Sequence, residues 1–568
     1  MTDQLAAYRS GKAPLPASYR LWPLYGAGLE SMGQNGLPIE VAMPAYGPDE
    51  LLIRHDACGL CFSDIKVINQ GQSHPRIFKN MQTDPVVLGH EVSMTVVGVG
   101  EALRDRYHIG DRLTLETDIS TEGKMLAYGY YFQGGLSQYS KIDRRIIYSD
   151  RGDNLIRLKP GIGYAESALT EPWACVVAAY RLEYRTGLKP GGVTWIIGSG
   201  KDRPYSLSAG FDQAAHPARL WLTHVPPAFS EWLKQRAQTL GVSVEEVPDV
   251  THPPADFADD IILLGANAEL IETVSPRLTQ FGVMALMEDV PMARPVSVDV
   301  GRIHYHRWVY VGSRGTDIAA AYRQAPVRSA LKPGGRAWFV GAGGPMGRMH
   351  VQRAIEFASG PAVMVCTDVS ELRLRELCDS FGPEAQARGI EWVCANPNNK
   401  EEYTRVMEPY FKQGFDDIVM LVPVPPVISD AARYLAPQGV MNVFAGVARG
   451  TMAALDLSQA YLSDQRVIGH SASEMTDMQL VLSKWDEKQL SPNRSVAAIG
   501  SLSAARDGMK AVKDTTFAGK VVIYPNIREF PLTALPDLKE ALPTVYAKLR
   551  DGEWTNEAEE EFLRLMLP

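Results

Sequence analysis

The chain contains two closely similar copies of one short sequence. LKPGGVTWIIGSG occupies residues 188–200, and LKPGGRAWFVGAG occupies residues 331–343, which is 143 positions later (331 − 188). Both copies continue from LKPGG into an apolar run with a tryptophan in the same register, and both then turn at Gly-x-Gly. An apolar run that ends in a glycine turn and leads into a helical pattern indicates a βαβ unit on a parallel sheet.

Further pairs of segments follow in the same order. DDIILLG, from residue 259, is echoed by DDIVMLV, from residue 416, and FGVMALM is echoed by QGVMNVF, in each case 157 positions later (416 − 259). VYVGSRGTD (309–317) lies opposite RVIGHSASE at the same spacing. We therefore predict two tandem dinucleotide-binding-type domains, copy one at residues 186–325 and copy two at residues 326–500.

Only copy two has the sequence of a cofactor site. Its turn, GAGGPMG, has glycines where the backbone must approach a pyrophosphate, beside a helix N-terminus that attracts it. The turn residues are Gly341, Gly343, Gly344, Pro345, Met346 and Gly347. The next apolar run ends in Asp368, an acid that can accept hydrogen bonds from a ribose diol and repel a 2′-phosphate, so NAD is favoured over NADP. Copy one has a charged KDR segment in its turn and no such acid, and we expect it to bind no dinucleotide.

The overall composition excludes several classes of protein. A chain of 568 residues is long enough for about 3–4 domains. A net charge of −9 does not indicate binding to nucleic acid or to an anionic membrane. No apolar run is long enough for a membrane span. The N-terminus has no apolar signal sequence, and six cysteines do not make a disulfide framework in so long a chain. We expect a cytoplasmic protein in which Cys366, Cys378 and Cys394 are packing residues.

The region before copy one carries the candidate metal ligands. Its short β-branched runs, broken by Gly, Pro and Asp, predict an irregular and mostly β domain. A catalytic zinc site takes three Cys, His or carboxylate ligands and leaves one position open. Cys61, His90 and Glu171 fit this inventory, with Glu91 beside His90 as an inner or neighbouring carboxylate. They come from CGLCFSD (58–64), LGHEV (88–92) and LTEPWAC (169–175).

Each of these residues also has a purely structural alternative. The cysteines are of a size to be buried packing residues, and a single histidine is often a satisfied core residue. Glu171 is equally explained as an acid at the positive end of a helix. The residues alone leave these alternatives open.

The order of motifs adds a resemblance. CGLCFSD, GHE, GDRL, GGLSQY and LTEP, followed by a dinucleotide-binding domain, resemble the zinc-dependent medium-chain alcohol and polyol dehydrogenases. The motifs are most similar to those of sorbose-1-phosphate reductase-like sugar-phosphate dehydrogenases. The resemblance implies an α/β chain with a GroES-like, mostly β catalytic domain and Rossmann-type doubly wound parallel-sheet domains, of which this chain has two in tandem. The expected catalytic domain is 1–185, completed by about 501–527, and a helical tail follows at 528–568.

The resemblance also implies roles for individual residues. Cys61, His90 and Glu171 would hold one catalytic zinc ion, and Glu91 would be able to approach the metal. Ser63 would pass the substrate proton outward, and Lys66 stands where many relatives have a relay histidine. Because no cysteine lies between Glu91 and Glu171, no structural zinc is expected. His74 and Arg76 are candidate substrate contacts, with an exposed loop as the alternative.

Together these features predict a zinc- and NAD(H)-dependent dehydrogenase or reductase. Its substrate would be a secondary alcohol on a polyol, sugar or sugar phosphate, and the alkoxide formed at zinc would release hydride to the nicotinamide. One alternative is a zinc and NAD enzyme with a redox-neutral lyase or epimerase outcome, and another is a non-catalytic scaffold. We expect copy one to pack against copy two as an intramolecular pseudo-dimer, giving a monomer or an oligomer through other surfaces. The rival hypothesis makes copy one part of the substrate cleft.

Overall fold

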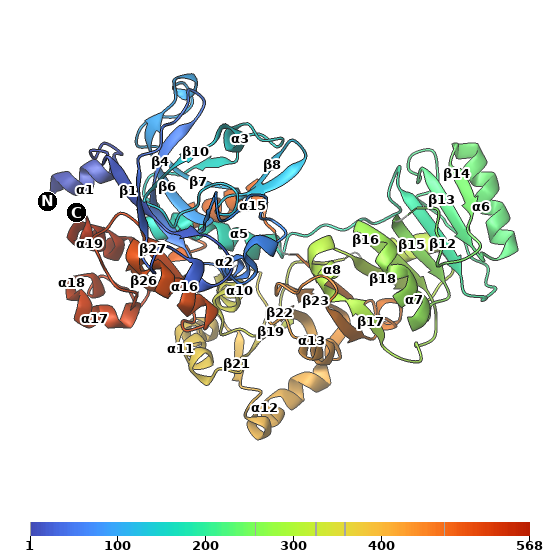
Figure 1. The fold of residues 1–568 in the computed structure, drawn as a ribbon. Helices are drawn as coiled ribbons and strands as arrows, with labels where there is room; N and C mark the ends of the chain where they lie inside the picture. The colour runs from blue at the N-terminus through green and yellow to red at the C-terminus, as the bar shows by residue number, and fades with distance from the viewer. Residues whose placement is uncertain (1, 256, 324–326, 357–358, 471) are drawn as a thin grey trace. The chain divides into compact units, whose positions relative to one another are not determined.

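The computed structural model describes residues 2–255, 257–323, 327–356, 359–470 and 472–568. The chain divides into two compact units (Figure 1). Unit 1 consists of residues 1–177, 344–349 and 473–568, and unit 2 consists of residues 178–343 and 350–472.

Unit 1 is built on an eight-stranded, mostly antiparallel sheet. The strand order is β11-β7-β6-β4-β27-β26-β28, and the eighth strand, β10, pairs with residues 51–54 of β4. The strands are β4 (Leu51–Gly59), β6 (Glu91–Val99), β7 (Arg112–Leu115), β10 (Tyr139–Ile142), β11 (Leu155–Arg157), β26 (Val496–Ser501), β27 (Lys520–Tyr524) and β28 (Thr533–Ala534). Because β27 pairs antiparallel with β4, the C-terminal part of the chain completes the sheet that the N-terminal part begins.

Helices and short strands surround this sheet. The strands are β1 (Ser18–Leu21), β2 (Pro23–Leu24), β3 (Ile39–Ala42), β5 (Val86–Val87), β8 (Asp118–Thr121) and β9 (Lys124–Ala127). The helices are α1 (Thr2–Arg9), α2 (Phe62–Gln70), α3 (Arg144–Ile147), α4 (Tyr164–Ala168), α5 (Thr170–Ala178), α15 (Met475–Asp486), α16 (Ala505–Lys513), α17 (Leu538–Ala541), α18 (Pro543–Tyr546) and α19 (Asn556–Met566).

The C-terminal helix α19 helps to hold the segment that leads to Glu171. The buried carboxylate of Glu559 accepts hydrogen bonds from the backbone N–H groups of Tyr164 and Ala165, at 2.6 and 2.8 Å. Tyr524 Oη donates to the same carboxylate at 2.7 Å. These bonds satisfy backbone donors at the start of α4, which have no partner within the helix. Helix α5, which carries Glu171, begins directly after α4.

Unit 2 contains two six-stranded sheets in which all strand pairs are parallel. Their orders are β14-β13-β12-β15-β16-β18 and β21-β20-β19-β22-β23-β25, so the order reverses at the β12/β15 and β19/β22 boundaries. The strands of the first are β12 (Val193–Gly198), β13 (Arg219–Thr223), β14 (Ser243–Glu246), β15 (Ala258–Leu264), β16 (Leu278–Met287) and β18 (Val309–Ser313). Those of the second are β19 (Arg336–Val340), β20 (Val363–Thr367), β21 (Glu391–Ala395), β22 (Phe415–Met420), β23 (Leu435–Val443) and β25 (Arg466–Gly469).

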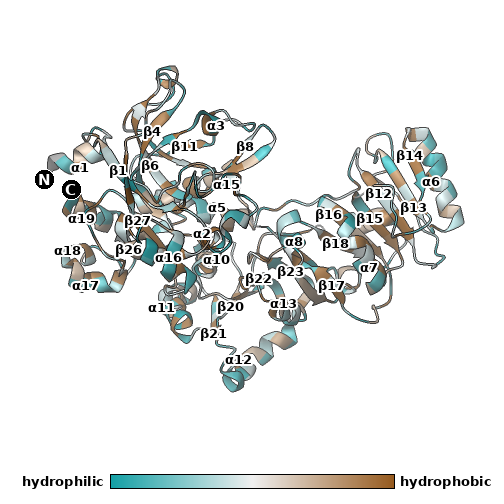
Figure 2. Cartoon of the chain, viewed as in Figure 1, coloured by the Kyte–Doolittle hydropathy of each residue, from teal (hydrophilic) through white to brown (hydrophobic). Residues whose placement is uncertain are grey.

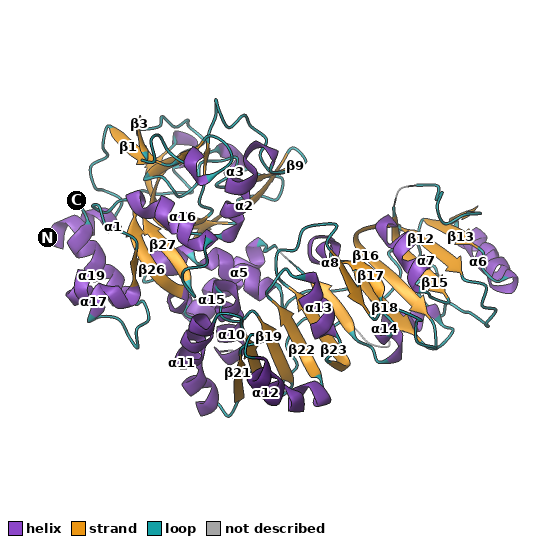
Figure 3. Ribbon diagram, turned by 60° about the horizontal axis from the view of Figure 1, so that its bottom comes forward, coloured by secondary structure: helices purple, strands orange, loops and turns teal. Residues whose placement is uncertain are grey.

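Helices flank both sheets, as Figure 3 shows. They are α6 (Pro227–Leu240), α7 (Ala268–Val274), α8 (Val300–His306), α9 (Ile318–Arg323), α10 (Pro345–Glu356), α11 (Glu371–Ala387), α12 (Lys400–Gln413), α13 (Pro425–Ala432) and α14 (Gln459–Leu462). In Figure 2 the strands around β12 and β15 are brown, whereas α6 and α12 are largely teal and white. This is the pattern of strands buried under helices on both faces. The predicted α/β class with two tandem doubly wound parallel sheets is confirmed.

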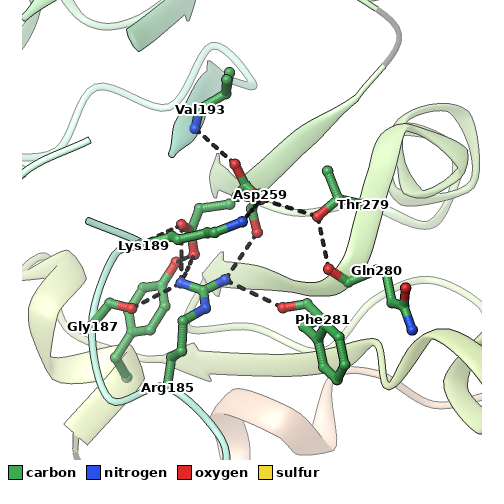
Figure 4. Close-up of polar contacts among 10 residues, drawn as sticks. Arg185, Gly187, Lys189, Val193, Asp259, Thr279, Gln280 and Phe281 are labelled. Atoms are coloured by element: carbon green, nitrogen blue, oxygen red, sulfur yellow. Dashed lines mark hydrogen bonds and ion pairs between the residues drawn. The ribbon is translucent and has the colours of Figure 1, made fainter. Parts of the chain in front are cut away.

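A cluster of charged residues fixes the first strand of copy one (Figure 4). Asp259 accepts hydrogen bonds from Lys189 Nζ at 2.7 Å and from the backbone N–H of Val193 at 2.9 Å. Asp260 accepts from the backbone N–H of Lys189 at 2.8 Å and from the Arg185 guanidinium at 2.9 Å. The Lys189 of LKPGG is thus held by the aspartate pair that begins DDIILLG.

Copy two repeats the contacts of this cluster that involve Lys189, Val193 and Arg185. Asp416 accepts from Lys332 Nζ at 2.7 Å and from the backbone N–H of Arg336 at 2.9 Å. Asp417 accepts from the backbone N–H of Lys332 at 2.8 Å and forms an ion pair with Arg328. The two sheets therefore share their local chemistry as well as their strand order.

The repeat extends to irregular backbone. The pairing of β15 with β16 shifts register between residues 258 and 260, and that of β22 with β23 shifts between residues 415 and 417. Phe281 and Gln438, which occupy equivalent positions, both have a left-handed φ, of 62° and 61°. Non-glycine residues seldom adopt this conformation, so its recurrence is a specific likeness.

The two sheets of unit 2 are joined. Strand β17 (Val296–Asp299) pairs antiparallel with β24 (Met452–Leu455), although one lies in each copy. A single cluster of buried apolar residues includes Trp195 and Trp308 of copy one and Trp338 and Phe415 of copy two. Copy one and copy two therefore share a hydrophobic core.

The prediction for two of the cysteines is wrong. Cys378 and Cys394 form a disulfide between α11 and β21, whereas Cys366 is a buried thiol on β20. The sequence separation of 16 residues did not reveal this pair, because it is the packing of α11 onto the edge strand β21 that brings the two residues together. Among the described residues, no helix has the length and apolar character needed to span a bilayer. The cytoplasmic location stays a prediction.

Candidate active site

Unit 1 brings three of the predicted ligands together. One ligand atom from each of Cys61, His90 and Glu91 lies within 4.8 Å of the other two. Cys61 is the N-cap residue of α2, which follows β4, and Glu91 is the first residue of β6. Because Gly59 at the end of β4 is the register partner of Glu91, the pairing of these strands places both motifs at one end of the sheet.

The imidazole of His90 is oriented by a neighbouring carboxylate. Its Nδ1 lies 3.1 Å from Asp64 Oδ1, and the histidine is 7% exposed. Burial alone would lower the pKa of His90, but the Asp64 carboxylate outweighs it and raises the pKa well above its usual value. A proton held on Nδ1 by a carboxylate leaves Nε2 as the metal-binding nitrogen.

Glu91 is paired with a residue from the far end of the chain. Lys520 Nζ lies 2.5 Å from Glu91 Oε1, and both side chains are buried. Burial alone would lower the pKa of Lys520, but the Glu91 carboxylate raises it. The second oxygen, Oε2, is buried and has no hydrogen-bond partner among the residues described. One carboxylate oxygen is thus neutralised, and the other is left for a further cation.

Ser63 lies inside this group. Its hydroxyl donates to Cys61 Sγ at 3.0 Å and lies 3.2 Å from His90 Nε2. A thiol, an imidazole nitrogen and an orphaned carboxylate oxygen around one point form the donor set that zinc prefers. The residues present therefore fit a zinc ion.

Glu171 lies beside the compact group but is not one of its three members. It is 9% exposed in α5, and Cys175 Sγ lies 3.8 Å from its Oε1. Burial raises the pKa of Glu171 to about 7, His90 opposes the shift, and Glu91 adds to it. A cation near Glu171 would favour its charged form. The role of Glu171 as a ligand stays a prediction.

Aromatic contacts connect His74 to the same region. The ring of Tyr130 contacts the rings of His74 and His90, each at a centroid distance of 5.8 Å. Burial lowers the pKa of His74, and the positive charges of Arg76 and then Lys66 lower it further. Lys66 lies three residues after Ser63 on α2, so the two side chains share one face of the helix.

The guanidinium of Arg76 is already engaged. Its Nη2 donates to Asp118 Oδ1 at 2.6 Å and to the carbonyl of Leu126 at 3.3 Å. A substrate anion would have to compete with this ion pair. The substrate roles of Arg76 and His74 stay predictions.

In unit 2, the turn after β19 has the backbone of a cofactor turn. Gly341 has φ +86°, and its N–H, with that of Ala342, donates to the carbonyl of Thr367. Asp368 Oδ2 accepts a hydrogen bond from the N–H of Gly343 at 3.0 Å. A Cβ at Gly343 would meet the Asp368 carboxylate at 3.0 Å, so a side chain does not fit there. The left-handed Gly341 and the lack of a side chain at Gly341 and Gly343 fit a dinucleotide, because a pyrophosphate lies against the backbone of such a turn.

The structure adds an arginine to this site. Arg373 Nη2 lies 3.1 Å from Asp368 Oδ1, and the Arg373 side chain is 17% exposed. No basic residue follows Asp368 directly in the sequence, but the first turn of α11 brings Arg373 back to it. The pair reduces the repulsion that Asp368 exerts on a 2′-phosphate, so the preference for NAD stays a prediction.

The corresponding edge of copy one is occupied by its own side chains. Lys201 Nζ lies 2.5 Å from Glu288 Oε1, and Glu288 is 2% exposed. The N–H of Ala266 donates to the other oxygen of Glu288 at 3.3 Å. Lys201 belongs to the KDR segment of the turn. That copy one binds no dinucleotide stays a prediction, which this ion pair supports.

Comparison with known proteins finds a family model that covers part of this site. Residues 47–149 match the family model described as the alcohol dehydrogenase GroES-like domain. This chain carries an alcohol dehydrogenase GroES-like domain. That domain contains the Cys61, Ser63, His90 and Glu91 cluster, and its match confirms the predicted GroES-like fold of this region.

Relatives extend over most of this chain. It is 23% identical to a mannitol-1-phosphate 5-dehydrogenase from Aliivibrio fischeri, over 87% of this chain and 84% of the relative. It is 19% identical to an L-sorbose 1-phosphate reductase from Klebsiella pneumoniae, over 94% of this chain and 95% of the relative. The crystal structure of 2R,3R-butanediol dehydrogenase from Bacillus subtilis shares the fold, with a TM-score of 0.53 at 16% identity, covering 89% of this chain and 100% of that chain. The predicted relationship to zinc-dependent medium-chain dehydrogenases is confirmed.

The sequence interpretation missed Asp64, Lys520 and Tyr130. Asp64 lies within the quoted CGLCFSD motif, so a carboxylate three residues after a candidate ligand was an available signal. A lysine at the start of the apolar run KVVIY was a second signal, since a buried lysine needs a carboxylate partner. Nothing in the sequence around Tyr130 distinguishes it from the tyrosines beside it.

Proposed function

We propose that this protein is a zinc- and NAD(H)-dependent dehydrogenase or reductase of a secondary alcohol on a polyol, sugar or sugar phosphate. The observation that carries the proposal is the compact group of Cys61, His90 and Glu91 with Ser63 inside it. An alcohol dehydrogenase GroES-like domain around that group supports the same reaction class.

Zinc would be held by Cys61, His90 and Glu171, with Glu91 able to approach it. When bound, a zinc ion supplies Lewis-acid polarisation of an alcohol or carbonyl oxygen. Asp64 would keep the proton of His90 on Nδ1, so that Nε2 is the nitrogen that would bind the metal. Lys520 neutralises one oxygen of Glu91 and keeps the total negative charge of the site low.

Ser63 would hold the substrate proton at Oγ. Its hydroxyl lies 3.0 Å from Cys61 Sγ and 3.2 Å from His90 Nε2, next to the residues that would hold the metal. Lys66 lies one helical turn further along α2, where relatives of this kind often have a histidine, and would accept the proton from Ser63 or hold a substrate oxygen. General acid–base help of this kind contributes about 10²–10⁴-fold to rate.

The dinucleotide would be held by copy two. Gly341, Gly343 and Gly344 allow the backbone to approach the pyrophosphate, and Pro345 begins the helix α10 whose N-terminus attracts it. Asp368 would accept hydrogen bonds from the adenosine ribose. When bound, the nicotinamide supplies the hydride acceptor or donor.

A phosphorylated sugar or polyol is the substrate class that the relatives support. A mannitol-1-phosphate dehydrogenase and a sorbose-1-phosphate reductase both match along most of their length. His74 and Arg76 would be the first residues to contact a substrate phosphate or hydroxyl, with Arg76 exchanging its partner Asp118 for the substrate.

The proposal also concerns assembly. Copy one would take the place of a partner subunit, so that the protein is a monomer or an oligomer formed through other surfaces. The antiparallel pairing of β17 with β24 and the shared apolar core support this. Light scattering that shows a dimer joined through the edge strand of copy two would contradict it.

The experiment that tests the function is a turnover screen. Purified protein is supplied with NADH or NAD and a set of ketoses, polyols and their phosphates, beside a Glu171→Ala variant. We expect oxidation of NADH, or reduction of NAD, with a phosphorylated substrate in the wild type and a loss of at least about 10²-fold in the variant. Product formation without net change in NADH would instead indicate the redox-neutral lyase or epimerase.

A further inference from the structure

The junction between copy one and copy two has the symmetry of a homodimer interface. In the β17–β24 pairing, Val296 lies opposite Leu455, and Val298 lies opposite Ala453. At the repeat spacing of 157, residue 296 of copy one is equivalent to residue 453 of copy two, and residue 298 is equivalent to residue 455. Each pair is therefore the symmetry equivalent of the other. This reciprocity defines an isologous, two-fold interface.

The helices that follow these strands obey the same relation. His304 of α8 and Tyr461 of α14 are 157 positions apart, as are Gly469 and Gly312. A Cβ at Gly469 would lie 2.9 Å from His304 Cα, and a Cβ at Gly312 would lie 2.7 Å from Tyr461 Cβ. Each copy thus lays a helix on a strand of the other so closely that only glycine fits.

The two sheets on which these helices pack differ in their nucleotide turns. Helix α8 of copy one packs on β23 and β25 of copy two, the sheet with the complete glycine turn. Helix α14 of copy two packs on β16 and β18 of copy one, the sheet whose turn is filled by the Lys201–Glu288 ion pair. Of these two helices, α8 is therefore the one that packs on a sheet whose glycine turn fits a dinucleotide.

His304 contacts the carboxyl end of a strand at that edge. It is 2% exposed, and its Nδ1 lies 2.9 Å from the carbonyl oxygen of Val443, the last residue of β23. Gly469, which meets the backbone of His304, is the last residue of β25. His470 follows it, and its pKa is lowered to about 4 by burial first and then by Arg307 and His304. The end of α8 thus borders the ends of both strands.

These strand ends lie on one side of the reversal in strand order. A dinucleotide binds across the carboxyl ends of the strands at such a reversal, here between β19 and β22. Asp368, at the end of β20, marks the side of the adenosine ribose. The nicotinamide half then lies over the ends of β22, β23 and β25, which include the two strands that α8 contacts.

We propose that copy one positions the nicotinamide half of the cofactor, with His304 as the positioning residue that fixes the carboxyl ends of β23 and β25. The inference rests on the proposed function in one respect, namely that copy two binds NAD(H). Copy one is then retained as a structural part of the cofactor site of copy two, although its own nucleotide edge is closed.

The test compares two ligands that differ only in the nicotinamide. Dissociation constants of the full chain are measured by calorimetry for NADH and for ADP-ribose, which lacks the nicotinamide. The variants are His304→Gln and Gly469→Ala. The matched controls are Tyr461→Phe and Gly312→Ala, which make the equivalent changes at the closed edge. We expect His304→Gln to weaken NADH binding about tenfold, as the loss of about one hydrogen bond implies. Gly469→Ala should weaken it as well, because the added Cβ displaces the backbone of His304. Both variants should leave ADP-ribose binding unchanged.

Each result has a distinct meaning. Equal weakening of NADH and ADP-ribose by His304→Gln would overturn the inference, because a general disturbance of the fold affects both ligands. Unchanged NADH binding in both variants, or an equal effect of Gly312→Ala, would overturn it too. Failure of the wild type to bind either ligand would contradict the proposed function itself. The split between KM for NADH and kcat gives a second readout, since a positioning role raises the former and lowers the latter.

Discussion

Glu91 and Lys520 form a buried ion pair of 2.5 Å although 429 positions separate them in the chain. Glu91 opens β6 next to the candidate ligand His90, and Lys520 opens β27, the strand that closes the sheet. The candidate metal group is therefore contacted by a residue from the C-terminal part of the chain. Any metal at the site changes the charge that surrounds Glu91, which makes the pair a sensitive reporter of metal binding.

Replacing Lys520 by methionine removes the positive partner of a buried carboxylate. We expect Lys520→Met to lower the free energy of unfolding of the zinc-free protein by about 3–5 kcal/mol, since an unpaired buried charge is left behind. With zinc bound, the loss should be smaller, because the metal itself compensates Glu91. Urea unfolding with and without zinc measures this difference. Lys510→Met, which breaks an exposed pair with Asp514, is the control and should leave the stability nearly unchanged in both conditions.

The carboxylate of Asp64 both caps α2 and orients His90. We expect Asp64→Asn to weaken zinc binding by about 10–100-fold, because a ligand histidine depends on the group that holds its second nitrogen. Asp143→Asn is the control, since the Asp143 carboxylate also accepts a backbone hydrogen bond at the start of a helix, as the N-cap residue of α3. Competition with a zinc-binding dye measures both. Equal zinc affinity in the two variants would show that Asp64 acts only as a cap.

Removal of the Ser63 hydroxyl separates proton transfer from metal binding. We expect Ser63→Ala to retain zinc but to lose about 10²–10⁴-fold in kcat on the substrate found in the screen. Ser73→Ala, on the exposed turn after α2, should leave both quantities unchanged. A Ser63→Ala enzyme with wild-type kcat would contradict the role given to this hydroxyl.

The buried histidine of β4 makes stability depend on pH. Burial lowers the pKa of His55 to about 3, against the opposing hydrogen bond to the carbonyl of Ser137. Below pH about 6.5 the unfolded state therefore binds more protons than the folded state, and the free energy of unfolding falls as pH decreases toward 3. This residue contributes up to about 1.4 kcal/mol per pH unit over that range. We expect a shallower pH dependence in His55→Gln and no change in the exposed His252→Gln, measured by urea unfolding from pH 7 to 4.5.

The sequence predicted those features that local patterns determine. LKPGG and the paired aspartates of DDIILLG and DDIVMLV predicted two equivalent parallel sheets, because the same short contacts repeat at the same spacing. The residue types in CGLCFSD and LGHEV made Cys61 and His90 candidate metal ligands, and the resemblance to zinc-dependent dehydrogenases implied that role, which stays a prediction. In both cases the signal lies within a few residues of the groups that interact.

Features created by distant contacts were not predicted. Lys520 meets Glu91 only because β27 returns to pair with β4, and Arg373 meets Asp368 only because α11 folds back over the end of β20. The disulfide of Cys378 and Cys394 likewise depends on how α11 packs on β21. Such pairings are set by tertiary packing, and a single sequence carries little information about them.

The measurement that tests this account most directly is the zinc content of the purified protein. Zinc per chain is determined by elemental mass spectrometry in the wild type and in Cys61→Ser, after purification without chelator. The account predicts one zinc ion per chain in the wild type and its loss or easy removal in the variant. A wild-type protein that carries no zinc and takes up none when zinc is added would contradict it.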